Sequence, residues 1–418
     1  MKILVVGSGG REHALVWKLA QSPIRPTLYC APGNPGIGKL ATRVPIKVNQ
    51  IDQIVSFARR ESIDLVVVGP EGPLVDGLAD RLRAASLNVF GCSQAAAAIE
   101  GSKIFMKQLA AKFEIPTAAF GVFDEQAAAE RFIDMTFERA SRLVVKADGL
   151  AAGKGVVLCS SANQAKQAAR QLLVNLGGRL VIEEFLVGRE ASLLAFVAGE
   201  AVVALPGVED HKTIGDGDQG AMTGGMGTIC PTPTLPPALQ PRATTELLEP
   251  AARALVAEGR PFFGLLFAGL ILTDDGPRLL EFNCRFGDPE TQVLMRRYSD
   301  DLLPALLDVA RQRVPVAPMF IEDAAVAVVM AADGYPDGAR LGDVILDLEE
   351  AEALPDTVVF HAGTETRGDS LVTAGGRVLA VSTVGKTLAE ARRAAYAAVH
   401  MISFRGAQFR SDIGGRDG

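Results

Sequence analysis

The sequence predicts a multidomain protein of the α/β and α+β class, and three observations lead to this prediction. The chain has 418 residues, which at about 150 residues per domain is enough for several domains. In the first 100 residues, short apolar runs alternate with stretches of helical period, as is typical of a parallel sheet covered by helices. After residue 323 the pattern changes to short strands, turns and a final helix at 387–402. We therefore expect an N-terminal α/β domain at 1–101, a central domain at 102–323 and a small C-terminal α+β domain at 324–418.

The elements of the N-terminal domain follow from local patterns. Residues 2–6 (KILVV) form a short apolar run and predict a buried strand. The next segment, GSGGREHALVWKLAQS, predicts a turn followed by a helix with Ala14, Leu15 and Leu19 on one face. Further strands are expected at 27–30, 63–69 and 87–91, and helices at about 52–61 and 74–85.

The central domain mixes strands and helices around one long glycine-rich segment. Ser102 is expected to cap a helix that ends at Pro116. Strands are predicted at 143–147, 155–159, 180–185, 191–198, 201–206, 265–273 and 278–283, and helices at 162–175 and about 243–258. Residues 206–237 are rich in Gly, Pro and Asp, and loops of that length are usually functional or disordered.

Composition excludes several classes of protein. The chain is 48% apolar and 22% charged, which does not fit a disordered protein. A net charge of −7 argues against a nucleic-acid binder with a broad basic face. The five cysteines form no CxxC pair or Cys/His cluster, so neither a zinc site nor a disulfide framework is expected. No apolar run is long enough for a membrane span or a signal peptide, and we therefore expect a cytoplasmic protein.

Two glycine loops are expected at one edge of the N-terminal sheet. The first, Gly7-Ser8-Gly9-Gly10-Arg11-Glu12-His13, follows a strand and opens a helix, where free amides attract anions. Dinucleotide binding requires a small residue where Glu12 stands, so a nicotinamide enzyme is disfavoured and a phosphorylated substrate is favoured. The second loop contains Gly69, Pro70 and Glu71 at the carboxyl end of another predicted strand, where ligands of open α/β sheets bind.

A lysine and a glycine-rich loop follow in residues 144–156, VVKADGLAAGKGV. Lys146 closes a strand, and the loop after it contains Gly149, Gly153, Lys154 and Gly155. The segment is not a Walker loop, but a strand lysine opposite a glycine flap can hold nucleotide phosphates from two sides. Downstream, the end of the strand at 180–185 offers backbone groups for an adenine edge, and the carboxylate of Glu190 can accept from ribose hydroxyls.

The segment at 280–290, LEFNCRFGDPE, is the most informative one. Alternation along a strand places Glu281, Asn283 and Arg285 on one face. A carboxylate and an amide oxygen two residues apart suit Mg²⁺, which takes few protein ligands and keeps phosphate oxygens and waters. Arg285 beside them is suited to clamp a phosphoryl group during transfer.

The motifs together resemble one enzyme family. Their order along the chain is GSGGREHA, GPEGPL, EGSKIFMK, VVKADGLAAGKG, VIEEFLVGREAS, DHKTIGDGDQGAMTGGMG, EFNCRFGDPETQ, HAGT, TAGGRVL and FRSDIG. This order resembles the phosphoribosylamine–glycine ligase family, the glycinamide ribonucleotide synthetases, within the ATP-grasp superfamily. The resemblance spans the whole chain and implies an ATP-grasp fold with an N-terminal pre-ATP-grasp domain and a mobile lid at 117–187.

The resemblance also implies roles for individual residues. Lys103 and Lys146 would contact ATP phosphates under a flap of Gly149 to Gly155, and Arg285 would act with Lys146 in catalysis. The adenine hinge would be Glu183, Glu184, Phe185 and Leu186, and Glu190 would hold the ribose. Glu281 and Asn283 would bind Mg²⁺ or Mn²⁺, while Asp210 and Lys212 would wall the acyl-phosphate site as catalytic residues. Phosphoribosylamine would contact Gly9, Gly10, Arg11, Glu12, Gly69, Pro70, Glu71, Arg285, Asp288, Gly363 and Gly375.

Two departures from the family pattern matter. Family loops commonly read DTGPNTGGMG, whereas this chain has Asp218-Gln219-Gly220-Ala221-Met222-Thr223, so we expect no catalytic role for Met222. The strand before the metal pair reads Phe267-Ala268-Gly269-Leu270 and lacks the extra carboxylate of many ATP-grasp enzymes.

The implied reaction is the ATP-dependent joining of glycine to 5-phosphoribosylamine through glycyl phosphate, in de novo purine biosynthesis. The expected partners are these small molecules, without nucleic acid or membrane, and the chain is expected to be a monomer or weak dimer. Three alternatives stay open: another ATP-grasp carboxylate–amine ligase or carboxylase, a nucleotide sensor without turnover, and the disfavoured nicotinamide enzyme.

Overall fold

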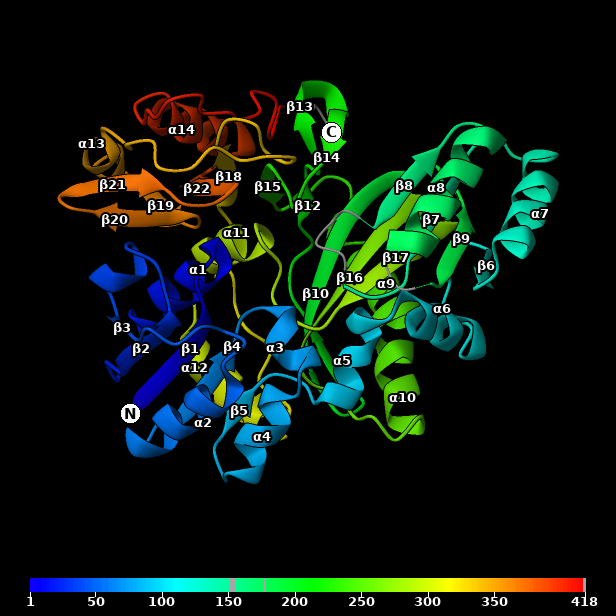
Figure 1. Ribbon diagram of the computed structural model, residues 1–418. Helices are drawn as coiled ribbons and strands as arrows, with labels where there is room; N and C mark the ends of the chain where they lie inside the picture. The colour runs from blue at the N-terminus through cyan, green and yellow to red at the C-terminus, as the bar shows by residue number, and fades with distance from the viewer. Residues whose placement is uncertain (151–154, 176–177, 416–418) are drawn as a thin grey trace.

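The computed structural model describes residues 1–150, 155–175 and 178–415. Figure 1 shows an N-terminal body in blue, a C-terminal body in orange and red above it, and a central part that extends to a separate small sheet in cyan and green. Gly153 and Lys154 of the predicted flap lie outside the described residues.

The N-terminal body is the predicted parallel sheet. Its strand order is β3-β2-β1-β4-β5, and every neighbouring pair is parallel. The strands are β1 (Lys2–Gly7), β2 (Thr27–Pro32), β3 (Thr42–Arg43), β4 (Leu65–Val68) and β5 (Val89–Phe90). The helices are α1 (Gly10–Leu19), η1 (Ile37–Lys39), α2 (Ile51–Arg60), α3 (Glu71–Val75) and α4 (Leu78–Ala84). The single helix predicted at 74–85 is divided at Gly77, whose φ of 84° is left-handed and ends the helical path.

The central part contains two antiparallel sheets. The small sheet has the order β6-β9-β7-β8, and the large one has the order β11-β10-β16-β17. The small sheet consists of β6 (Phe120–Phe123), β7 (Leu143–Ala147), β8 (Val156–Cys159) and β9 (Leu180–Glu184), with α7 (Gln126–Phe137) and α8 (Ala162–Asn175). It has a hydrophobic core of its own that includes Ile133, Leu143 and Ile182. The large sheet consists of β10 (Arg189–Ala198), β11 (Ala201–Ala204), β16 (Phe263–Thr273) and β17 (Gly276–Asn283).

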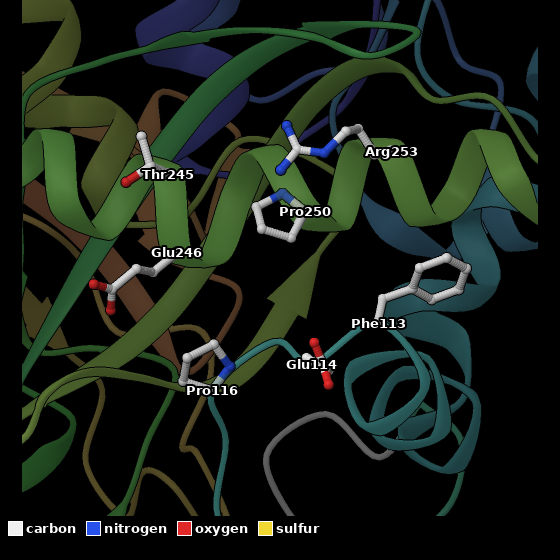
Figure 2. Close-up of a pocket in the computed structure, with 7 residues that line it drawn as sticks. All are labelled: Phe113, Glu114, Pro116, Thr245, Glu246, Pro250 and Arg253. Carbon is white, nitrogen blue, oxygen red and sulfur yellow. The ribbon is translucent and has the colours of Figure 1, made fainter.

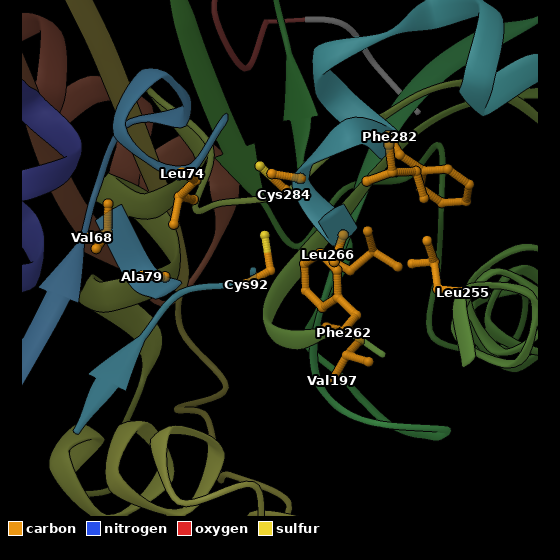
Figure 3. Packing of buried hydrophobic residues seen from close by; sticks show 14 of the residues in the cluster. Val68, Leu74, Ala79, Cys92, Val197, Leu255, Phe262, Leu266, Phe282 and Cys284 are labelled. Atoms are coloured by element: carbon orange, nitrogen blue, oxygen red, sulfur yellow. The ribbon is translucent and has the colours of Figure 1, made fainter. Parts of the chain in front are cut away.

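The helices of the central part lie around the large sheet, and its core is continuous with that of the N-terminal body. Ser102 caps α6 (Lys103–Lys112) as predicted, because its hydroxyl accepts from the amide of Phe105 at 3.1 Å. The other helices of this part are α5 (Gln94–Gly101), α9 (Gln240–Ala243), the π-helical η3 (Thr244–Leu248), α10 (Glu249–Ala257), α11 (Glu290–Arg297) and α12 (Leu302–Ala310). Figure 3 shows one core in which Val68 and Leu74 of the N-terminal body continue into Leu266 and Phe282 of the large sheet.

The predicted long loop at 206–237 contains regular structure, which corrects that expectation. Its strands β12 (Glu209–Asp210) and β15 (Gly227–Cys230) pair with each other, and β15 also pairs with β18 (Ala324–Ala331) of the C-terminal body. Between them lie β13 (Thr213–Gly215), η2 (Asp216–Asp218) and β14 (Gln219–Met222), which form a hairpin. The C-terminal sheet therefore includes strands from both sides of residue 324.

The C-terminal body is an antiparallel sheet with a helix, as predicted for an α+β unit. The sheet order is β12-β15-β18-β22-β19, and β20 and β21 form a separate hairpin. The elements are β18 (Ala324–Ala331), α13 (Leu348–Glu352), β19 (Thr357–His361), β20 (Thr364–Arg367), β21 (Ser370–Thr373), β22 (Arg377–Gly385) and α14 (Leu388–Val399). Among the described residues, no helix is long and apolar enough to cross a membrane.

Candidate active site

The small sheet and the large sheet meet where β7 and β17 come together. The ammonium of Lys146, near the end of β7, lies 3.4 Å from the carbonyl oxygen of Leu280 on β17. Thr117 donates to the carbonyl of Leu279 at 2.7 Å on the same strand. These contacts bring the predicted phosphate lysine beside the strand that carries the predicted metal pair.

Glu281 stands among four cationic side chains. Burial alone would raise the pKa of its carboxyl group, but Lys212, Lys146, Lys103 and Arg285 hold that pKa below its usual range. Burial lowers the pKa of Lys103, and the carboxylate of Glu281 is the strongest of the groups that raise this pKa. The ammonium of Lys103 donates to the carbonyl of Gly149 at 2.9 Å, next to the predicted flap. The arrangement keeps this carboxylate ionised beside several cations, which suits a polyanion accompanied by a cation.

Asn283 and Arg285 lie together as the strand alternation predicted. A guanidinium nitrogen of Arg285 donates to Oδ1 of Asn283 at 3.2 Å, although β17 itself ends at Asn283. Arg285 also forms ion pairs with Glu71 at 3.1 Å and with Glu100 at 3.0 Å. These two carboxylates come from the start of α3 and from α5, so Arg285 ties two segments of the N-terminal part to the metal strand.

Glu100 is a site residue that the sequence reasoning missed. It is buried, and its second carboxylate oxygen accepts from the amide of Cys284 at 2.7 Å. Burial raises the pKa of this carboxyl group, against the lowering effect of Arg285. The signal was a single acidic residue near the end of the otherwise apolar helix QAAAAIEG.

The segment around β12 contributes Asp210 and Lys212. Lys212 pairs with Glu190 at 3.3 Å, so the predicted ribose carboxylate has a cationic partner in this structure. Burial alone would lower the pKa of Lys212, but Glu190, Glu281 and Asp210 raise it above its ordinary range. Burial, reinforced by Glu290, raises the pKa of Asp210 well above its usual value.

Asp210 also has an unusual local environment. Its buried Oδ1 has no hydrogen-bond partner among the described residues. Gly225, with a φ of 112°, approaches so closely that a Cβ there would lie 2.6 Å from this oxygen. The nearby Glu290 is buried and accepts from the hydroxyl of Ser192 at 3.1 Å. Glu290 was quoted in a motif but not predicted as a site residue.

The predicted adenine hinge is divided in the structure. The side chain of Glu183 is buried and forms ion pairs with Lys107 and Lys146, whereas the hinge is predicted from the backbone groups of this strand end and stays a prediction. Glu184 is exposed, and its carboxylate accepts from the amide of Ala119 at 3.0 Å. The ring of Phe185 lies 4.0 Å from the guanidinium carbon of Arg142, and the chain continues through Leu186 out of the small sheet.

The two N-terminal glycine loops lie side by side, held by Glu12. Its carboxylate accepts from the amide of Gly9 and from the guanidinium of Arg11, both at 2.6 Å. A Cβ on Gly69 of the second loop would lie 2.1 Å from the same carboxylate. Glu12 is buried in these contacts and anchors both loops, while its predicted substrate contact stays a prediction.

Asp288 connects the first glycine loop to the C-terminal body. It lies 3.4 Å from the amide of Arg11 and accepts from the side chain of Gln292 at 2.8 Å. Arg377 of β22 donates to the carbonyl of Asp288 at 2.7 Å and to that of Gly224 at 2.6 Å. Three distant segments therefore meet at this aspartate.

The predicted C-terminal glycines lie directly behind Arg377. The amide of Gly363 donates to the carbonyl of Arg377 at 2.9 Å. A Cβ on Gly363 would lie 2.5 Å from the Cα of Gly375, so the two turns touch through their backbones. The structure thus brings both turns to the same junction as Asp288.

Two buried histidines join the N-terminal and C-terminal bodies. The amide of His361 on β19 donates to Nδ1 of His13 on α1 at 2.8 Å. Burial and the neighbouring His361 lower the pKa of His13 to about 3, and burial and Lys39 lower that of His361 to about 4. Both rings are therefore neutral near pH 7.

Figure 2 shows a surface pocket lined by residues between Phe113 and Pro116 and by residues of η3 and α10. None of the predicted site residues lines it, and its charged groups are Glu114, Glu246 and Arg253. The candidate active site is therefore the convergence of strand ends and loops, and not this pocket.

Comparison with known proteins relates these features to one family. Family models of phosphoribosylglycinamide synthetase match the chain as an N domain at 1–100, an ATP-grasp (A) domain at 101–291 and a C domain at 325–416. A phosphoribosylamine–glycine ligase of Brucella melitensis is 47% identical over 100% of this chain and 98% of its own length. That of Caulobacter vibrioides is 48% identical with the same coverage.

Solved structures agree with these matches. The crystal structure of phosphoribosylamine–glycine ligase from Thermotoga maritima superposes with a TM-score of 0.84 at 32% identity, covering 99% of this chain and 100% of that one. Biotin carboxylase from Campylobacter jejuni, in complex with an ATP analogue, reaches a TM-score of 0.73 at 14% identity over 98% of this chain and 92% of its own. The second likeness concerns the fold alone.

Proposed function

Because the chain belongs to the phosphoribosylglycinamide synthetase family, it is an ATP-dependent carbon–nitrogen ligase that joins glycine to phosphoribosylamine, and we propose that it does so where β7, β12 and β17 meet. The observation that carries this proposal is the group of four cations around the ionised Glu281. Such a site neutralises a triphosphate and positions its terminal phosphoryl group.

The nucleotide is assigned to the space between the small and the large sheet. Lys103 and Lys146 bind its phosphates, supported by their common proximity to Glu281. The flap predicted from Gly149 to Gly155, with Gly153 and Lys154, belongs to the same proposal, and its residues 151–154 lie outside the described ones. The backbone of Glu183, Glu184, Phe185 and Leu186 takes the adenine. The carboxylate of Glu190 leaves Lys212 and accepts from the ribose hydroxyls when nucleotide binds.

Glu281 and Asn283 fit a divalent cation. The carboxylate is kept ionised by its cationic neighbours, and the hydrogen bond from Arg285 fixes the amide oxygen of Asn283 toward the site. Two hard oxygen donors suit Mg²⁺, or Mn²⁺ in its place, since such an ion takes few protein ligands and would also accept water and phosphate oxygens. Among the described residues, no cluster of three or more His, Cys, Asp or Glu offers a complete protein ligand set. A bound ion would supply charge neutralisation on the transferring phosphate.

The chemistry begins at the glycine carboxylate. One of its oxygens attacks the γ-phosphorus of ATP, the bond to the bridging oxygen breaks, and glycyl phosphate and ADP form. The amine of 5-phosphoribosylamine then attacks the acyl carbon and phosphate leaves with the acyl oxygen. The first step needs no general base because a carboxylate is already ionised at neutral pH. Lys146 and Arg285 neutralise the phosphoryl group during its transfer. Asp210 and Lys212 line the acyl-phosphate site on the other side.

Phosphoribosylamine is assigned to the junction of the N-terminal and C-terminal bodies. Gly9, Gly10 and Arg11 at the start of α1 border its phosphate, although the amide of Gly9 already donates to Glu12. The second glycine loop (Gly69, Pro70 and Glu71) and the C-terminal turns (Gly363 and Gly375) border the same junction. Asp288, which contacts both bodies, orients the ligand beside Arg285. Glu12 serves this site indirectly by holding its loops together.

The test is a coupled assay of ADP release in which each substrate is omitted in turn. We expect ADP only when ATP, the divalent ion and glycine are present, and full turnover only when phosphoribosylamine is added. Release of ADP with bicarbonate in place of glycine would indicate a carboxylase. Nucleotide binding without any ADP release would indicate a sensor.

We also infer a cytoplasmic location and a monomeric or weakly dimeric state. The location is supported by the five cysteines, which are all buried free thiols. Sedimentation over a range of protein concentrations tests the oligomeric state.

A further inference from the structure

Lys107 is a buried lysine that neither the reaction nor the predicted site uses. It lies on α6, four residues after Lys103, and its side chain has no exposed surface. Its ammonium donates to the hydroxyl of Thr117 at 2.7 Å and forms an ion pair with Glu183. It also lies 5.7 Å from the centre of the Phe120 ring. Burial lowers the pKa of Lys107, while Glu183 opposes that effect.

Glu183 is shared between two lysines that come from different elements. One carboxylate oxygen pairs with Lys107 of α6, and the other pairs with Lys146 of β7. The side chain of Glu183 is 2% exposed, whereas that of Lys146 is 11% exposed. The two cations therefore differ in position, because Lys107 is enclosed behind the carboxylate and Lys146 has some exposed surface.

The charge balance of this triad bears on phosphate binding. Two ammonium groups and one carboxylate leave one positive charge in excess. When Lys146 turns from Glu183 to a phosphate oxygen, the carboxylate keeps Lys107 as its partner. A buried carboxylate without any cation would be strongly destabilised, so without Lys107 the movement of Lys146 would be opposed.

We propose that Lys107 is a positioning residue that neutralises Glu183 permanently and so frees Lys146 to bind the nucleotide phosphates. The inference rests on the proposed role of Lys146. Thr117 supports it, since this hydroxyl accepts from Lys107 and donates to Leu279 on β17, which fixes the ammonium on the far side of the carboxylate.

The experiment compares three variants by equilibrium binding of a non-hydrolysable ATP analogue with Mg²⁺ and by steady-state kinetics. Lys107→Met leaves Lys146 to neutralise Glu183 alone, and we expect the analogue to bind at least about tenfold more weakly while the KM for glycine stays unchanged. Glu183→Gln removes the competitor of the phosphates, so binding is not weakened. The double variant K107M/E183Q removes both charges, and its affinity returns to within about threefold of the original.

The matched control is Lys112→Met, which removes an exposed lysine of the same helix that pairs with Glu258 and leaves binding unchanged. Thermal unfolding shows whether each variant folds, and the charge-neutral double variant provides the comparison if K107M does not. Unchanged affinity in K107M, equal losses in K107M and E183Q, or no recovery in the double variant would overturn the inference. If Lys146→Ala leaves the affinity for the analogue unchanged, the proposed nucleotide site itself is wrong. If Lys146→Ala weakens binding and K107M does not, the nucleotide site is supported and the proposed role of Lys107 is wrong.

Discussion

At the scale of single residues, the candidate site depends on carboxylates and cations that neutralise one another before any ligand is present. Glu281 has four cationic neighbours, Glu183 has two, and Arg285 has Glu71 and Glu100. Each cation that a ligand would take over already has an opposite charge beside it. Ligand binding then exchanges partners and does not require a free charge to be buried.

Replacing Glu281 by alanine tests the carboxylate around which the four cationic side chains lie. We expect divalent-ion-dependent turnover to fall by at least about 100-fold, because one of two proposed metal ligands is lost and the cations repel each other. Its strand neighbours Leu279 and Phe282 stay packed, so the unfolding temperature changes little. Turnover is measured against Mg²⁺ concentration, with the exposed Glu365→Ala as control. Original activity in Glu281→Ala would contradict the metal assignment.

At the scale of elements, the sequence was most informative where the period of the pattern was clear. The strands at 143–147 and 278–283 and the helix at 162–175 are confirmed within two residues. The hairpin and strands within 206–237 were not foreseen, because short strands interrupted by glycines carry no period. Helices α11 and α12 were also not predicted, although α11 begins inside the quoted motif at Glu290.

The same scale explains which side-chain contacts were missed. Glu183 is far from Lys107 in the sequence, and Glu100 is far from Arg285, so both pairings depend on how α5 and α6 pack against β9 and the end of β17. Strand alternation placed Asn283 beside Arg285 because both lie on one short segment. The local sequence pattern therefore predicted which side chains are neighbours along one element. Contacts between side chains of different elements could be identified only from the folded structure.

A helix cap in the C-terminal body offers a test of element stability. The hydroxyl of Thr387 accepts from the amide of Glu390 at 3.2 Å at the start of α14. Thr387→Ala is expected to lower the free energy of unfolding by about 1 kcal/mol, because a helix amide loses its partner. The exposed Arg393→Ala on the same helix should change it by less than about 0.5 kcal/mol. Chemical denaturation measures both, and equal effects would contradict the capping role.

At the scale of the whole molecule, three bodies converge on one junction. Arg377 of β22 reaches Asp288, which reaches Arg11 of α1, and Arg285 joins α5 to the metal strand. The glycine loops, the turn glycines and the acidic motif thus come from all three parts of the chain. The order of motifs predicted this set of segments, but its closure around Asp288 depends on packing between the bodies.

The histidine pair between the bodies predicts a dependence of stability on pH. The folded pKa values of about 3 for His13 and about 4 for His361 lie below the ordinary 6.5. Their contribution is therefore fully present above pH 6.5 and is lost as the pH falls through 4 toward 3. Each imidazole adds up to about 1.4 kcal/mol per pH unit. The free energy of unfolding should decrease as the pH is lowered from 7 to 5, a range in which most carboxylates do not yet titrate. The decrease should be less steep in His13→Gln. A flat profile would contradict buried neutral rings.

The central claim is that the site transfers a phosphoryl group to the carboxylate of glycine. The most direct measurement uses glycine labelled with ¹⁸O in both carboxylate oxygens, with ATP and phosphoribosylamine, and mass spectrometry of the released phosphate. The account predicts one labelled oxygen in the phosphate, because the acyl oxygen leaves with it. Unlabelled phosphate released together with the ligated product would contradict the account.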